Sequence, residues 1–489
     1  MKNEKKIRVR FAPSPTGELH IGGLRTALNN FLFARKNEGE FLLRIEDTDR
    51  KRFVEGSMER MIADLRWAGL EFDGEPYIQS ERLEIYKEYV QKLIDEGKAY
   101  YCFCTPERLE QMRAKQQTEK LAPKYDRHCS NLNAEDVKKK IENGEKYVVR
   151  FKIPEGTTIF EDLVFGKVEV KNENIDDQVL LKADGFPTYH LAVVIDDYLM
   201  KISHVFRGAE WLPSTPKHVL LYQAFGWEKE MPEFVHMANI LNKDKKKLSK
   251  REGSVSVADF RAQSYPASAL VNFIALLGWN PKTEQEIFTM EELIEQFDVA
   301  KMNRAGGVFD IDRLNWISAQ HIKKMSTDEI YVQALPFIEK KEYYKTWKVK
   351  YETLSDKEKE EYIKKIISVE KDRLEKFDQI GENNQFFFFD PKNVSPDDLR
   401  WKDSSDEDTK NNLKKSLEVL KNISDSEWTL ENIEKNLLDA AGDKRGDLLF
   451  PLRSALTGQK KSPSPFEVAW VLEKNKSIER ISSALDCLA

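Results

Sequence analysis

Near the start of the chain, segments whose apolar residues repeat as in a strand alternate with segments whose apolar residues repeat as in a helix. Residues 7–11 (IRVRF) alternate apolar and basic side chains, which predicts a short strand. Residues 21–39 carry apolar side chains at helical spacing up to a glycine. Residues 41–49 then predict a buried strand that runs into an acidic turn, and residues 58–69 a second amphipathic helix. This order is typical of a parallel α/β sheet, in which the loop after the first strand binds ligands.

The α/β pattern breaks in residues 100–190, which predict an insertion into a split α/β domain. This segment is rich in charge and poor in periodicity, with strand-like runs at 147–153 and 163–170. The α/β pattern returns with residues 179–197 (VLLKADGFPTYHLAVVIDD).

The remainder of the chain is predicted to be helical. Residues 214–227 predict a helix with Ser214 or Thr215 as its N-cap and a proline in its first turn. Strand patterns nearly vanish after residue 255, and Lys/Glu-rich amphipathic helices dominate from 325 onward. Residues 403–412 (DSSDEDTKNN) are so polar that we expect a solvated loop there.

Composition and charge fit a large soluble protein with several domains. The 489 residues suggest about three domains, and 40% hydrophobic residues are enough for several cores. No apolar run approaches the ~18 residues of a membrane helix, the N-terminus lacks the apolar stretch of a secretory signal, and four cysteines do not make a disulfide framework. We therefore expect a cytoplasmic protein with no membrane partner. The net charge of −6 argues against a passive nucleic-acid coat but leaves room for an RNA enzyme with local basic patches.

The loop FAPSPTGELHIGG, residues 11–23, combines chain-stiffening prolines with glycines and a single histidine, His20. The helix that begins near Ile21 directs its free N–H groups and positive dipole end at this loop, which suits a phosphate. A tight loop whose histidine only caps the helix explains the same residues.

A second motif, KKKLSKR at 245–251, distinguishes these alternatives. It places Lys247, Lys250 and Arg251 around a small Ser249, and taken alone it predicts a solvated charged loop. Across a split sheet, however, both motifs can flank one nucleotide. Cations beside a leaving pyrophosphate stabilise the charge that develops there by several kcal/mol.

The two motifs together resemble the signatures of class I aminoacyl-tRNA synthetases. Further stretches resemble the bacterial glutamyl-tRNA synthetase family, namely LLRIEDTDR, YIQSERLEIY, DGFPTYHLAVVIDD, FRGAEWLPSTPKHVLLYQAFGW, GGVFDIDRLNWI and FPLRSALTGQKKSPSPFEVAWVLEK. The similarity spans nearly the whole chain in the expected order.

The resemblance implies a split Rossmann-type parallel-sheet catalytic domain with an α+β insertion, followed by all-α stem-contact and anticodon-binding domains. The implied boundaries are 1–100 and 191–255 for the catalytic halves, 101–190 for the acceptor-binding insertion, 256–325 for the stem-contact region and 326–489 for the anticodon-binding region.

The implied reaction has two steps. Glutamate attacks the α-phosphate of ATP to give glutamyl-adenylate and diphosphate, and the terminal adenosine of tRNA(Glu) then takes the glutamyl group on its 2′-hydroxyl, releasing AMP. Mg²⁺ is expected with ATP. The implied partners are tRNA(Glu) and L-glutamate, and we expect a monomer.

Site residues follow from the resemblance by position. The implied catalytic residues are His20, Lys247 and Lys250. ATP is implied to contact these three together with Gly22, Gly23, Glu210 and Ile240. Glutamate is implied to contact Arg10, Ala12, Ser14, Glu46, Tyr189, Arg207 and Trp211.

The glutamate set suits its substrate. Arginine forks suit two carboxylates and Glu46 suits an ammonium group, but which arginine holds which carboxylate stays open. Outside the family context, Arg10 fits a strand-surface arginine and Glu46 a helix-capping acid.

Three cysteines gather in the inserted segment, which suggests zinc. Many relatives complete the site with C-x-H, but Asn131 stands at that histidine position here. A related subgroup, the glutamyl-queuosine synthetases, uses Tyr-x₃-Cys, which this chain also has. The implied structural zinc ligands are Cys102, Cys104, Tyr125 and Cys129, with His128 as a substitute fourth ligand. The alternative is three reduced, buried thiols without metal.

The resemblance places anticodon recognition in the C-terminal helices. Arg373 aligns with an arginine that reads a pyrimidine of the glutamate anticodon in discriminating relatives, so we predict a discriminating enzyme. The segment LRSALTG, with Leu456 and Thr457, is the other predicted anticodon-facing piece.

Other functions remain as alternatives. A non-discriminating enzyme would also charge tRNA(Gln). A glutaminyl-tRNA synthetase is disfavoured because an amide pocket does not suit the charge of Arg207. A glutamyl-queuosine synthetase normally lacks the C-terminal helices. A small-molecule nucleotidylyltransferase shares the histidine loop but is usually far shorter, and a catalytically inactive tRNA-binding protein would have lost His20 or Lys250.

Overall fold

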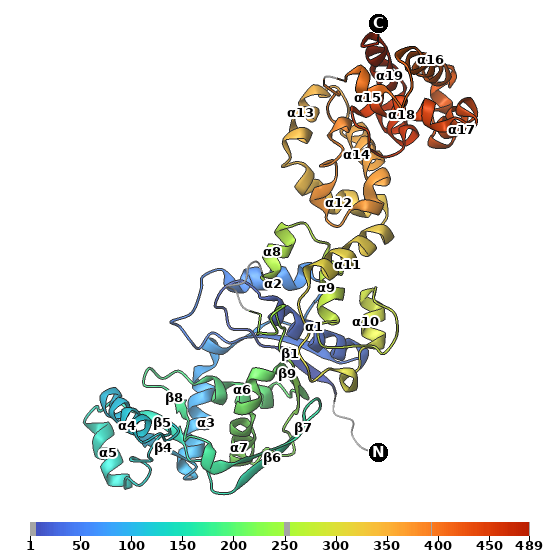
Figure 1. Cartoon of the computed structure of the whole chain (residues 1–489). Helices are drawn as coiled ribbons and strands as arrows, with labels where there is room; N and C mark the ends of the chain where they lie inside the picture. Colours follow the sequence, from blue (N-terminus) through green and yellow to red (C-terminus); the bar gives the residue numbers. More distant parts are fainter. Residues whose placement is uncertain (1–5, 249–254, 393, 489) are drawn as a thin grey trace. The chain divides into compact units, whose positions relative to one another are not determined.

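The computed structural model describes residues 6–248, 255–392 and 394–488 (Figure 1). The chain divides into two compact units. The first holds Met1–Phe260 and Leu270–Ile311, and the second holds Arg261–Ala269 and Asp312–Ala489. Within the described residues, no helix is long and apolar enough to cross a membrane.

A parallel sheet in two halves forms the centre of the first unit. Its strands are β1 (Arg8–Phe11), β2 (Glu40–Ile45), β3 (Tyr77–Ile78), β9 (His204–Gly208) and β10 (Glu233–Met237). β1, β2 and β3 run parallel in that order, and β9 runs parallel to β10. The halves meet where the Ser203 N–H donates to the Arg8 carbonyl at 2.8 Å. The predicted split α/β sheet is therefore confirmed.

Helices connect and cover these strands. They are α1 (Ile21–Lys36), α2 (Ser57–Trp67), α3 (Leu83–Asp95), α6 (Tyr189–Leu199) and α7 (Thr215–Phe225). The helical spacing of apolar residues in α1 buries Leu24, Leu28 and Leu32 completely, and the helix packs on β1 and β2. This packing presents the N-terminus of α1 at the carboxyl end of β1, where parallel sheets bind ligands.

A second, antiparallel sheet lies in the inserted segment. Its order is β4 (Ala99–Cys102), β5 (Val148–Phe151) and β8 (Val179–Leu181), accompanied by α4 (Pro106–Thr118) and α5 (Ala134–Glu142). In Figure 1 these two helices lie beside β4 and β5.

A hairpin within the inserted segment returns to the catalytic sheet. β6 (Thr157–Asp162) and β7 (Gly166–Lys171) are antiparallel, and β6 pairs with β10 in parallel through Asp162 and Phe234. The strand predicted at 163–170 corresponds to β7, but residues 163–165 belong to the turn. The strand before that turn, β6, was not predicted. Only every second residue of β6 is buried, so its apolar signal is weak.

Ser214 occupies the predicted N-cap position of α7, with the proline in the first turn, but its side chain does not cap the helix. A 3₁₀ turn, Ala209–Ser214, runs directly into α7, and Ser214 makes no side-chain capping bond. Its hydroxyl donates instead to the Trp211 carbonyl at 2.8 Å, while the Thr215 hydroxyl accepts from Arg207 at 2.7 Å. The Ser214 hydroxyl therefore bonds within the 3₁₀ turn, and the Thr215 hydroxyl bonds to a side chain of the neighbouring cleft.

Helices make up the rest of the described chain. They are α8 (Val257–Ala262), α9 (Ala267–Ala275), α10 (Met290–Gln296), α11 (Ile311–Lys324), α12 (Thr327–Ile338), α13 (Glu342–Lys350), α14 (Asp356–Glu370), α15 (Pro396–Leu399), α16 (Asp406–Asn422), α17 (Leu430–Ala441), α18 (Arg445–Thr457) and α19 (Pro465–Asp486). One apolar core, which includes Trp347, Ile366 and Leu452, extends through the second unit from α12 to α19.

The polar segment 403–412 is not a loop, because α16 begins at Asp406. Ser405 is its N-cap: the Ser405 hydroxyl accepts from the Asp408 N–H at 3.1 Å, and the Asp408 carboxylate accepts from the Ser405 N–H at 3.3 Å. Acidic side chains in the first turn also face the positive end of the helix dipole. The acidic run therefore starts a helix, and high polarity alone predicts this segment wrongly.

Replacing the cap should destabilise the second unit. We expect Ser405→Ala to lower its unfolding free energy by about 1 kcal/mol, because the Asp408 N–H loses its acceptor. Urea unfolding of the full chain, followed by circular dichroism, measures this. The control is Ser483→Ala, which changes an exposed serine inside α19 and should not destabilise. Equal midpoints for the two variants would contradict the assigned cap.

Candidate active site

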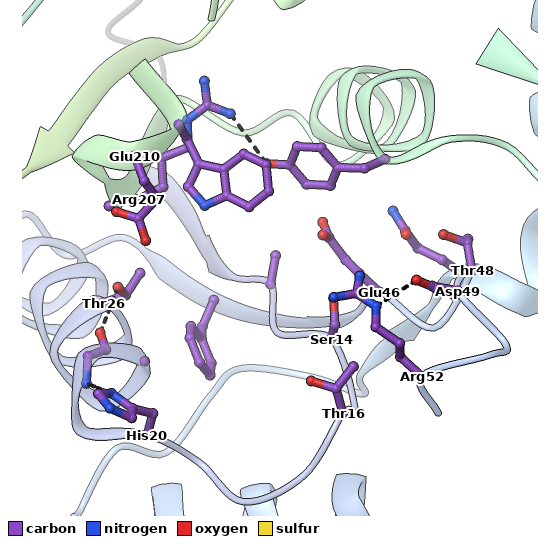
Figure 2. Close-up of a pocket in the computed structure, with 18 of the residues that line it drawn as sticks. Ser14, Thr16, His20, Thr26, Glu46, Thr48, Asp49, Arg52, Arg207 and Glu210 are labelled. Carbon is purple, nitrogen blue, oxygen red and sulfur yellow. Dashed lines mark hydrogen bonds and ion pairs between the residues drawn. The ribbon is translucent and has the colours of Figure 1, made fainter. Parts of the chain in front are cut away.

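A cleft of about 1030 Å³ in the first unit collects the described residues that were predicted for ATP and glutamate (Figure 2). These residues are Arg10, Ala12, Ser14, His20, Gly22, Gly23, Glu46, Tyr189, Arg207, Glu210, Trp211, Ile240 and Lys247. Lys250, the remaining predicted catalytic lysine, lies outside the described residues. Figure 2 shows His20 on the α1 side of the cleft and Arg207 with Glu210 on the opposite side.

The N-terminus of α1 forms one wall of the cleft. His20 is the N-cap, with an extended backbone, and its Nδ1 accepts from the Gly22 N–H at 3.0 Å. A Cβ at position 22 would come within 3.2 Å of that nitrogen, so glycine leaves room for the imidazole. His20 thus caps the helix and also lines the cleft, and the two interpretations of the histidine are compatible.

Arg25, one turn further along α1, is a residue of the cleft that sequence reasoning missed. Its guanidinium is buried and donates to the Leu277 carbonyl at 2.6 Å and the Ala238 carbonyl at 2.5 Å. Burial lowers the pKa of Arg25 to about 10. The available signal was its position on the apolar stripe of the helix, four residues after Ile21 and three before Leu28. Arg25 ties α1 to the chain beyond β10.

Buried charges join the two halves of the sheet below the cleft. Arg10 on β1 makes a two-point contact with Asp197 on α6, with N–O distances of 2.9 and 3.2 Å. Arg44 on β2 binds the same carboxylate at 2.6 Å and Glu46 at 3.0 Å. All four side chains are buried, so Arg10 is not a surface arginine and Glu46 does not cap a helix. Arg44 and Asp197 gave no separate signal in the sequence.

This network changes the acidity of its carboxyl groups in opposite directions. Burial raises the pKa of Glu46, against the attraction of Arg44 and Arg10. Burial acts on Asp197 in the same sense, but the two guanidinium groups outweigh it and lower the pKa of Asp197. Of the two carboxyl groups, Asp197 is therefore the one that the network holds in its charged form.

Arg207 on β9 differs from Arg10 in its partners. Its side chain is 5% exposed, and its hydrogen-bond partners in the described part of the chain are all uncharged. They are Tyr189, Thr215, His218 and His236, at N–O or N–N distances of 3.3, 2.7, 3.2 and 3.0 Å. Arg207 is thus a buried cation beside the cleft, and no carboxylate of the described residues contacts its guanidinium, so a ligand anion suits it.

The cleft also carries a charge pair and a pair of aromatic rings. Lys247 Nζ lies 3.0 Å from Glu210 Oε1, and both side chains are largely exposed. The rings of Tyr189 and Trp211 lie 4.6 Å apart between their centroids. Ile240 is buried at the floor.

The predicted metal ligands gather in the inserted segment. The sulfur atoms of Cys102, Cys104 and Cys129 all lie within 4.8 Å of one another. The Tyr125 hydroxyl lies 3.3 Å from the first two of these sulfur atoms. His128 is exposed and is not part of the cluster. Three thiols and one phenol so close together could serve as the four ligands of a structural zinc ion.

The predicted anticodon residues lie in the second unit. Arg373 is exposed in a 3₁₀ turn after α14. Leu456 is fully buried and Thr457 is 3% exposed, and the Thr457 hydroxyl donates to the Arg453 carbonyl at 2.7 Å. These two side chains face the interior, so they shape the end of α18 from inside.

Comparisons with known proteins place the chain in a family. Residues 6–316 match the profile described as "tRNA synthetases class I (E and Q), catalytic domain", and residues 329–485 match "Anticodon binding domain". The glutamate–tRNA ligase of Chloroherpeton thalassium is 44% identical over 99% of each chain, and that of Alkaliphilus metalliredigens is 45% identical over 98% of each. The crystal structure of a glutamate tRNA ligase from Elizabethkingia meningosepticum in complex with its amino acid matches with a TM-score of 0.85 and 36% identity, covering 99% of this chain and all of that one. With the split sheet and the helical C-terminal unit, these matches confirm the resemblance stated from the motifs: the chain belongs to the glutamate–tRNA ligase family of class I tRNA synthetases.

Proposed function

We propose that this chain ligates L-glutamate to tRNA(Glu) with consumption of ATP. In the first step, an oxygen of the glutamate α-carboxylate bonds to the α-phosphorus of ATP, and the bond to diphosphate breaks. In the second, the 2′-hydroxyl of the terminal adenosine bonds to the activated carbonyl carbon, and AMP leaves with the bonding electrons. The enzyme acts as a monomer that orients the reactants and stabilises phosphate charge.

The observation that carries this proposal is the charge pattern of the cleft. Arg207 is buried with uncharged partners, so a ligand carboxylate supplies its counter-ion. Glu46 lines the same cleft and suits an ammonium group. Arg10 also lines the cleft, but Asp197 already holds its fork. A glutamine amide would leave the Arg207 charge buried without an anion, which disfavours a glutaminyl enzyme.

The ATP side follows from the wall opposite Arg207. His20, Gly22 and Gly23 surround the N-terminus of α1, where N–H groups and the helix dipole favour phosphate. Lys247 would exchange Glu210 for the charge of the leaving diphosphate, together with Lys250. Mg²⁺ bound with ATP would neutralise part of that charge.

The remaining parts serve the tRNA. We assign the inserted segment to the acceptor end, 256–325 to the stem and 326–489 to the anticodon. Arg373, exposed and cationic, is the side chain proposed to read the anticodon. Leu456 and Thr457 support that surface from inside, because their side chains are buried.

A structural zinc ion completes the insertion. Cys102, Cys104, Cys129 and the Tyr125 hydroxyl would hold it, and four protein ligands leave no open position for chemistry. The ion would tie β4 to the loop before α5.

Aminoacylation with labelled glutamate on separate tRNA(Glu) and tRNA(Gln) tests the function. We expect charging of tRNA(Glu) alone. Charging of both would overturn the discriminating role of Arg373, and charging of neither by folded protein with ATP would overturn the function.

Arg373→Gln should weaken charging of tRNA(Glu) by raising KM for the tRNA, because one contact between a cation and a base is lost.

Arg207→Met should raise KM for glutamate by about tenfold or more, because a hydrogen-bonded charge pair with the substrate disappears. KM for ATP should stay within about twofold. Arg8→Met is the control, since Arg8 lies on β1 but pairs with Glu40 away from the cleft. Unchanged glutamate kinetics in Arg207→Met would rule out this residue as the carboxylate partner.

Elemental analysis of the purified full chain should find about one zinc ion per molecule, as expected for a closed four-ligand site. Cys129→Ala should lose most of it, whereas Cys487→Ala should keep it, because Cys487 is exposed and outside the cluster. A zinc content near zero in the unmodified chain would support the alternative of three reduced thiols.

A further inference from the structure

We propose that Asp162 and His236 are positioning residues that hold Arg207 for a carboxylate of the amino-acid substrate. This inference rests on the proposed function. It assigns a role to two buried side chains that contribute no atom to the reaction, in a line from Asp162 through His236 to the Arg207 guanidinium.

The hydrogen bonds along this line fix the tautomer of His236. Arg207 Nε donates to His236 Nε2 at 3.0 Å, and an arginine cannot accept, so Nε2 carries a lone pair. The proton of the neutral ring therefore sits on Nδ1, which lies 2.6 Å from Asp162 Oδ2 and donates to it. Burial lowers the pKa of His236 even though Asp162 acts against it, which agrees with a neutral ring.

Hydrogen bonds also fix the tautomer of a second histidine, His218, on the opposite side of Arg207. Arg207 Nη1 lies 3.2 Å from His218 Nδ1, so that nitrogen accepts and the His218 proton sits on Nε2. His218 Nε2 then donates to His190 Nδ1 at 3.0 Å. Burial lowers the pKa of both histidines, to about 3 for His190. Two neutral imidazoles thus orient the guanidinium from two directions without cancelling its charge.

Asp162 is itself held in one orientation. Its Oδ1 accepts from the N–H groups of Val164 and Phe165 at 3.0 and 2.8 Å, in the turn between β6 and β7. Its Oδ2 faces His236 alone, accepting from the backbone N–H at 3.2 Å and from Nδ1. The carboxylate is completely buried at the point where β6 pairs with β10.

This arrangement gives a carboxylate selectivity that a directly paired arginine would lack. An acid in contact with the guanidinium would neutralise Arg207 and compete with the substrate. Placing Asp162 one imidazole away keeps the arginine oriented and leaves the face toward Tyr189 and the cleft for a ligand. The substrate carboxylate is then the first anion in direct contact with Arg207.

Asp162→Asn tests the tautomer. The asparagine oxygen would stay on the Val164 and Phe165 N–H groups, so its NH₂ group would face His236. His236 Nδ1 must then accept, its proton moves to Nε2, and two donors meet at Arg207. We expect KM for glutamate in aminoacylation of tRNA(Glu) to rise by about tenfold to hundredfold, with KM for ATP within about twofold.

His236→Leu and His236→Gln form a matched pair. Leucine removes both hydrogen bonds and should raise KM for glutamate to a similar extent. Glutamine offers an amide N–H to Asp162 and an amide oxygen to Arg207, so it should restore most of the affinity. His204→Gln is the control, because His204 is a largely buried histidine of the adjacent strand that contacts Ser203 and Phe33 but not Arg207. It should leave KM for glutamate unchanged.

The outcomes separate positioning from simple stability. Equal increases in both KM values, or a glutamate KM within about twofold of wild type in Asp162→Asn and His236→Leu, would overturn the proposal. A His236→Gln variant no better than His236→Leu would overturn it as well. If His236→Leu does not fold, Asp162→Asn and His236→Gln carry the test. Failure of the unmodified chain to charge tRNA(Glu) would instead contradict the proposed function.

Discussion

The active-site unit depends on one buried carboxylate, that of Asp197. It accepts from Arg10 on β1 and Arg44 on β2, and so binds α6 of the second half of the sheet to two strands of the first half. Removing one partner of such a buried pair costs about 3–5 kcal/mol, because the other charge is left without compensation. The two halves are separated by the whole inserted segment in sequence, and this contact aligns them across the cleft.

The same contact decides how charge is distributed toward the ligand. Arg10 is compensated within the protein, whereas Arg207 is surrounded by a hydroxyl, a phenol and two neutral imidazoles. Two arginines that looked equivalent in the sequence therefore differ in their need for an anion. Glu46 is only partly compensated for its burial. Burial raises its pKa, and the nearby charges of Arg44 and Arg10 reduce that increase without cancelling it. An incoming ammonium group would favour its charged form.

Local patterns predicted the sheet and the helix after β1, because each depends on neighbours a few positions away. The residues that line the cleft came from the family resemblance, by position. Features that depend on residues far apart in the sequence were not predicted. Arg44 and Asp197 lie 153 positions apart and find each other only in the fold. The segment at 403–412 failed for a different reason, since acidic residues suit both solvent and the first turn of a helix, and the Ser405 cap decides between them. The N-cap of α7 lies at Ser214 as predicted, but the Ser214 and Thr215 hydroxyls bond to Trp211 and Arg207 rather than to the start of the helix.

Asp162 links the inserted segment directly to the catalytic sheet. The hairpin β6–β7 is part of the inserted segment. Its strand β6 pairs with β10, and the Asp162 carboxylate at the end of β6 accepts a hydrogen bond from His236. The segment that carries the cysteine cluster and the element that orients Arg207 are therefore parts of one continuous stretch of chain. Because β6 is hydrogen-bonded to the catalytic sheet at Asp162 itself, a shift of the hairpin would change the His236 hydrogen bond before it changed any residue that touches the ligand. With the role proposed for Asp162, amino-acid recognition would require β6 to stay paired with β10, whatever else the insertion binds.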